Sequence, residues 1–130
     1  MDHSQYIEAD DYYDLATEWI KNRNYEKAKD CLKHTLSLNA KFIYAYIDLA
    51  DIHVRQNDFH SAIRFLIKAT KIDPTFDRLY YLIAKYSFMS EDYKSALLNI
   101  NKALKIKEDV TYQSMREVIS QQYREKHRYC

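Results

Sequence analysis

The sequence predicts an all-α fold built from three copies of one helical hairpin. When the sequence is shifted by 34 residues, three segments superimpose without a change of register: residues 9–42, 43–76 and 77–110. Within each segment apolar side chains recur at intervals of three and four, which is the period of an amphipathic helix. The chain contains no glycine, and this argues against an all-β fold, whose tight turns draw on that residue.

Six columns of the repeat carry the same kind of side chain in every copy. They are Tyr12/Tyr46/Tyr80, Leu15/Leu49/Ile83, Ala16/Ala50/Ala84, Tyr25/Phe59/Tyr93, Ala28/Ala62/Ala96 and Leu38/Ile72/Ile106. The first three columns fall in the first half of each copy and the last three in the second half. We therefore expect two helices of about fourteen residues in each copy.

A short polar break separates the two helices of each copy. The breaks read NRN at 22–24, QND at 56–58 and SED at 90–92. Asn and Asp tolerate left-handed backbone and cap the helix that follows, so a hairpin can form there without glycine. Glu91 fits such a turn worst, because a residue with a Cβ atom is strained at positive φ.

The two ends of the chain depart from the repeat. Residues 111–130 carry one apolar stripe, formed by Tyr112, Met115, Ile119 and Tyr123, with polar residues outside it. This pattern predicts a single amphipathic helix that caps the open end of the stack, giving seven helices in all. Residues 1–8 are expected to be a lead-in, either frayed or part of the first helix.

Composition and charge exclude several classes of protein. The chain of 130 residues has 20 basic and 19 acidic side chains and a net charge of +1, which lacks the basic excess of most nucleic-acid binders. Without glycine, neither a P-loop nor a dinucleotide fingerprint can form. Cys31 and Cys130 are read as free thiols in a reducing compartment. The acidic N-terminus does not resemble a signal peptide and no apolar run approaches a membrane span, so a soluble, cytoplasmic protein is predicted.

The repeated residues resemble the tetratricopeptide repeat family. The likeness rests on the runs Tyr12/Leu15/Ala16 and Tyr46/Leu49/Ala50, on Tyr25/Ala28, Phe59/Ala62 and Tyr93/Ala96, and on Ala69, Ala103 and Ile72-Asp73-Pro74. It implies a right-handed superhelical solenoid whose first helices line a concave groove. It also implies a protein-interaction module or adaptor that binds a peptide segment of a partner, with no enzymatic activity and no cofactor.

The resemblance also places candidate partner-binding residues on the first helix of each repeat. These are Tyr13, Thr17, Lys21, Tyr44, Ile47, Asp48, Asp51, Arg55, Arg78, Tyr81, Leu82, Lys85 and Phe88. Their mixture of aromatic rings and of both charge signs suits a peptide with apolar anchors and charged flanks.

One subclass of the family can be tested against the sequence. Chaperone-binding members hold a C-terminal carboxylate with Lys, Asn and Arg side chains on the groove helices. At the corresponding positions this chain has Tyr13, Thr17, Asp48 and Leu82, which are neither basic nor amide side chains. Only Arg78 fits the family's carboxylate-binding set. Because Asp48 would repel a carboxylate, the sequence predicts that the chain is not a receptor for Hsp70 or Hsp90 tails.

No catalytic or metal-binding constellation is apparent in the sequence. Cys31 and His34 are three residues apart on one helix, but a nucleophile dyad also needs an oxyanion donor and an orienting group. Adding His53 and His60 does not produce the ligand spacing of structural zinc. We expect surface or packing roles for these side chains, with His53 partly buried between helices.

Other functions are left open by the sequence. Residues 1–20 hold six acids and no Lys or Arg, and residues 111–130 hold four bases against two acids, so head-to-tail self-association is the main alternative. The chain could also be an adaptor domain of a longer protein. Tyrosine-rich helical hairpins can bind RNA, but Asp14, Asp48 and Asp51 in the expected groove would repel phosphate.

Overall fold

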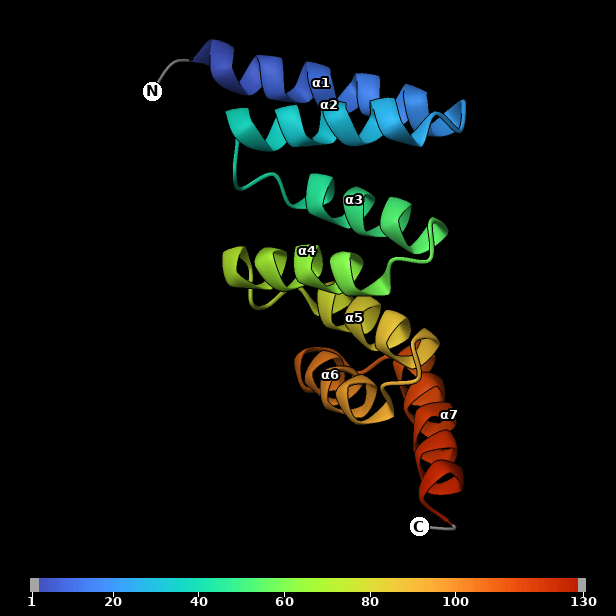
Figure 1. Cartoon of the computed structure of the whole chain (residues 1–130). Helices are drawn as coiled ribbons and strands as arrows, with labels where there is room; N and C mark the ends of the chain where they lie inside the picture. The colour runs from blue at the N-terminus through green and yellow to red at the C-terminus, as the bar shows by residue number, and fades with distance from the viewer. Residues whose placement is uncertain (1–2, 129–130) are drawn as a thin grey trace.

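The structure is a computed structural model that describes residues 3–128, with side chains from Glu8 onward, and in this part of the chain it contains seven α-helices and no strand (Figure 1). The predicted all-α fold is confirmed. The helices are α1 (His3–Lys21), α2 (Tyr25–Leu38), α3 (Ile43–Arg55), α4 (Phe59–Ile72), α5 (Asp77–Met89), α6 (Tyr93–Ile106) and α7 (Val110–His127).

The helix boundaries follow the 34-residue period of the sequence. The second helices α2, α4 and α6 begin at Tyr25, Phe59 and Tyr93, which form one of the repeated columns. The helix α1 departs from the period because it begins already at His3, so most of the expected lead-in is helical.

Each hairpin turn contains one residue in the left-handed region. Its φ is 59° at Arg23, 61° at Asn57 and 66° at Glu91. The next residue caps the following helix: Asn24 accepts a hydrogen bond from the Lys27 amide at 3.3 Å, and the two aspartates at the equivalent positions, Asp58 and Asp92, accept in the same way. The predicted capping is confirmed, and Glu91 has the strained conformation that the sequence suggested.

The helices form antiparallel pairs that stack along a solenoid (Figure 1). Alanine fills the places where helices cross: Ala16, Ala50 and Ala84 on the first helices are fully buried, as are Ala28 and Ala62 on the second helices. A larger side chain at these positions would push apart helix axes that pack roughly 8–10 Å from each other.

The two ends of the stack are covered differently. Leu15 is 45% exposed, although its equivalents Leu49 and Ile83 are 0% and 3% exposed, because no helix among residues 3–128 covers that side of α1. At the other end α7 packs on α6 and buries Tyr112 and Ile119 in the last core cluster. The predicted capping helix is thus confirmed. Among residues 3–128 no helix is both long and apolar enough to cross a membrane.

Candidate functional site

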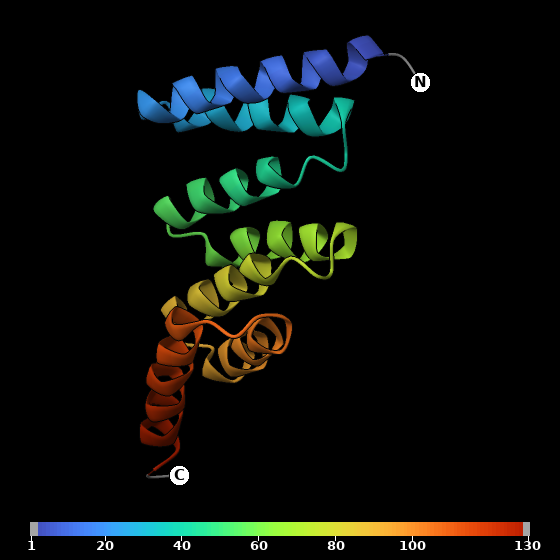
Figure 2. The ribbon, with the colours of Figure 1, turned by 180° about the vertical axis from the view of Figure 1, so that it is seen from behind.

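The first helices of the three pairs follow one another along one side of the solenoid and carry the predicted partner-binding residues (Figure 2). We call this surface of α1, α3 and α5 the first-helix face. On it the exposed members of the predicted set are Lys21, Tyr44, Arg55, Arg78 and Lys85. The half-buried members are Tyr13, Thr17, Asp48, Asp51, Tyr81 and Phe88.

A hydrogen bond joins the first two helices of this face. The Tyr13 hydroxyl donates to Asp48 Oδ2 at 2.6 Å, a short distance typical of a bond to a charged acceptor. Burial and this bond to a carboxylate raise the pKa of Tyr13. Burial also raises the pKa of Asp48, while the Tyr13 hydroxyl acts in the opposite direction. The pair therefore fixes a half-buried carboxylate on the first-helix face.

Further charges surround Asp48. Asp51 adds to the rise in the pKa of Asp48, and Arg78 of α5 opposes it. Asp51 is itself paired with Arg55, whose Nε lies 3.0 Å from Asp51 Oδ2. The middle of the face thus carries both charge signs from two successive helices, as the sequence predicted for these residue types.

Some predicted residues are engaged by the protein itself. Ile47 is 7% exposed and belongs to the core, together with Leu82. The Thr17 hydroxyl donates to the Asp14 carbonyl at 2.7 Å, within its own helix. The Tyr81 ring stacks on Tyr112 of α7 with centroids 5.0 Å apart, so the capping helix covers part of that ring. By contrast, Tyr44 is 51% exposed.

The structure also shows residues that the sequence reasoning missed. The Tyr112 hydroxyl donates to Asp77 Oδ2 at 2.6 Å, which links α5 to α7 as Tyr13–Asp48 links α1 to α3. Tyr86 is buried near Asp51, and burial followed by the Asp51 charge raises the pKa of its hydroxyl. Tyr86 stands where Ile52 stands in the preceding repeat, and this polar replacement was the signal that could have revealed it.

Cys31 is partly buried, and the rings of His34 and His53 pack against other aromatic rings. Burial raises the pKa of the Cys31 thiol, which disfavours the thiolate form. The His34 ring lies 4.0 Å from the Tyr12 ring, and His53 is partly buried as expected. No group of three or more His, Cys, Asp or Glu among residues 3–128 could hold a metal ion. Cys130 lies outside the described residues.

The family model described as the tetratricopeptide repeat matches residues 20–86, which is more than half of the chain. No curated protein sequence matches the chain. A family match of this extent agrees with the helix pairs and with the repeated alanines at their crossings.

Solved structures of similar fold come from several proteins. The first TPR of Spaghetti (RPAP3) bound to the HSP90 peptide SRMEEVD has a TM-score of 0.80 and 15% identity, covering 89% of this chain and 93% of that chain. The Sgt2 TPR domain from Aspergillus fumigatus has a TM-score of 0.82 and 18% identity. The match covers 93% of this chain and 82% of that chain. The Yersinia enterocolitica type III secretion chaperone SycD, in complex with a peptide of the translocator YopD, has a TM-score of 0.79 and 16% identity. The match covers 88% of this chain and 93% of that chain. At these identities the likeness shows the fold alone.

Proposed function

Because the chain belongs to the tetratricopeptide repeat family, we propose that it is an interaction module that binds a peptide segment of a partner protein on its first-helix face. The fold in general mediates protein–protein interaction and has no enzymatic activity of its own. The observation that carries the proposal is the exposure of aromatic and charged side chains on successive first helices, above all Tyr44 and Arg78.

The physical argument for peptide binding is preorganisation. The first-helix face is built on packed helices and held by the Tyr13–Asp48 bond, so little order has to be gained when a partner binds. Tyr44 offers a large ring that loses little conformational entropy, and Arg78 offers a fork of donors for a carboxylate or carbonyl. An extended or helical segment with an apolar anchor beside an acidic residue fits this pair.

A peptide-display selection followed by affinity measurement tests this proposal. Peptides are selected on the wild-type chain, and their Kd is measured for Tyr44→Ala/Arg78→Gln and for the control Leu98→Ala/Lys71→Gln on exposed positions of α6 and α4. We expect a loss of about tenfold or more for the first pair, because truncating an interface anchor typically costs more than 1 kcal/mol. Peptides that bind both double variants equally well would place the binding surface elsewhere.

We further propose that the partner is not the acidic tail of Hsp70 or Hsp90. Asp48 carries a negative charge at a position where such a tail needs a donor, and Leu82 is 7% exposed in the core. A fluorescent peptide of the sequence SRMEEVD, which the Spaghetti domain holds, is expected not to bind. Saturable binding that Arg78→Gln abolishes would overturn this exclusion.

A further inference from the structure

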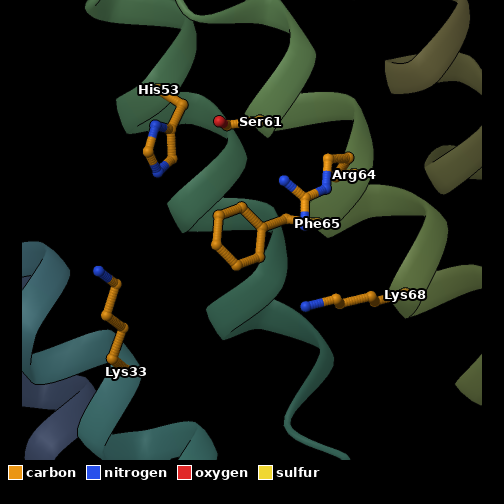
Figure 3. Close-up of a pocket in the computed structure, with 6 residues that line it drawn as sticks. All are labelled: Lys33, His53, Ser61, Arg64, Phe65 and Lys68. Atoms are coloured by element: carbon orange, nitrogen blue, oxygen red, sulfur yellow. The ribbon is translucent and has the colours of Figure 1, made fainter.

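A basic cavity lies between the first and second repeats, beside the second helices. Its volume is about 170 Å³, well above what one water molecule needs. The residues that line it are Lys33 of α2, His53 of α3, and Ser61, Arg64, Phe65 and Lys68 of α4 (Figure 3). We call these six residues the basic cavity.

Three cations converge on the basic cavity, and no acidic residue lines it. In Figure 3 the Lys33 side chain rises from α2 on one side of the Phe65 ring, and the cationic ends of Arg64 and Lys68 extend from α4 toward the ring from the other side. Among residues 3–128, none of these three cations has a carboxylate within ion-pair distance. This cluster stands out in a chain whose net charge is only +1.

The inner wall of the basic cavity is held by ring packing. The His53 and Phe65 rings stack with centroids 5.4 Å apart, and Lys68 Nζ lies 5.6 Å from the Phe65 centroid. His53 Nδ1 is 3.4 Å from Asp58 Oδ2, and the same carboxylate interacts with the Ser61 hydroxyl, so Asp58 is directed to these two residues of the cavity wall. Burial lowers the pKa of His53, the charges of Lys29 and Lys33 lower it further, and Asp58 opposes them.

The next junction of the solenoid provides an internal comparison. One repeat further along, the positions of Lys33 and Arg64 are occupied by Ile67 and Leu98, and only Lys68 has a basic equivalent, Lys102. Ile67 and Leu98 are 42% and 57% exposed, so the repeat accepts apolar side chains at these two positions. The helical hairpin therefore does not require cations there, and the basic cluster is particular to the first junction.

We propose that the basic cavity binds the dianionic phosphoryl group of a phosphate or phosphate monoester. Three cations from two helices, none with a carboxylate within ion-pair distance, surround one small volume. The Ser61 hydroxyl interacts with the Asp58 carboxylate and is therefore not counted as a donor to the ligand. A phosphate monoester carries nearly two negative charges above its second pKa of about 6. The site goes beyond the proposed peptide-binding function, because it lies against α2 and α4 and uses no residue of the predicted partner-binding set.

Nuclear magnetic resonance titration of the whole chain tests this proposal, at low ionic strength and at a pH well above about 6. The probes are inorganic phosphate, an alanine-flanked phosphoserine peptide and the same peptide without phosphate. The variant is Lys33→Gln/Arg64→Gln. The control Lys71→Gln/Lys105→Gln removes the same charge from exposed positions of α4 and α6 that do not line the cavity.

We expect saturable shifts of the His53, Ser61 and Phe65 signals with both phosphorylated probes and none with the unphosphorylated peptide. The double variant should weaken binding about tenfold or more, because two charge-assisted contacts are lost, and the control should not. Tighter binding of the phosphopeptide than of inorganic phosphate would assign the site to a phosphorylated protein, and equal binding would assign it to the free ion. Absence of saturable shifts, or an equal loss in the control, would overturn the proposal.

Discussion

The bond between Tyr13 and Asp48 gives a direct test of how the first-helix face is held together. The substitution Tyr13→Phe removes only the hydroxyl that donates to Asp48 Oδ2 at 2.6 Å. The ring stays in place against Phe42, whose centroid lies 4.8 Å away. The variant therefore measures the hydrogen bond and leaves the packing of α1 on α3 unchanged.

The expected loss in the free energy of unfolding is about 1–2 kcal/mol. Hydrogen bonds to charged groups contribute about 1.5–3 kcal/mol, and we take values around the lower end of that range because both side chains are only half-buried. Tyr12→Phe on the same helix is the matched control, since no hydrogen bond of the Tyr12 hydroxyl is found within residues 3–128. It should leave the free energy nearly unchanged.

The loss of unfolding free energy in Tyr13→Phe should be larger at neutral pH than at acidic pH. Burial raises the pKa of Asp48 in the folded state above its unfolded value, so ionisation of Asp48 lowers stability as pH rises through the folded pKa. The Tyr13 hydroxyl partly offsets this because it stabilises the ionised form. The effect of Tyr13→Phe should thus be full where Asp48 is ionised and should shrink as pH falls through the pKa of Asp48.

Urea unfolding followed by circular dichroism, at neutral and at acidic pH, checks these expectations. A double-mutant cycle with Asp48→Asn separates the hydrogen bond from other effects of each substitution. A loss of the same size at both pH values, or in Tyr12→Phe, would refute the assignment of the stabilisation to this bond.

Two further predictions concern the hairpins. Ala50→Leu should lower stability by about 1–3 kcal/mol, because Ala50 is fully buried against α4 and a larger side chain overpacks the crossing; an unchanged thermal melt would contradict the proposed contact. Glu91→Gly should raise stability by about 0.5–1 kcal/mol, because φ is 66° there and glycine removes the Cβ clash. Ser90→Gly, where φ is −91°, should give no such gain, and an equal gain in both would argue against strain at Glu91.

The candidate site could be predicted in part from the sequence. The position of a residue within its repeat was enough to assign Tyr44 and Arg78 to the first helices, where both are exposed. It could not show that Tyr112 stacks on Tyr81, since the capping helix lies outside the repeat and has no equivalent column. The burial of Ile47 was equally hidden, because a helical period does not distinguish a groove position from one at the edge of the core.

The sequence by itself determined the helices, most of their boundaries and their pairing into hairpins, although the start of α1 at His3 was left open. These depend on side chains close together in the chain: the apolar period, the Asn and Asp caps and the alanines at each crossing. Only the tertiary structure decided which charged groups meet across repeats. Lys33 comes to face Arg64, and Tyr13 comes to face Asp48, because the rotation between successive hairpins is set by the packing of whole helices.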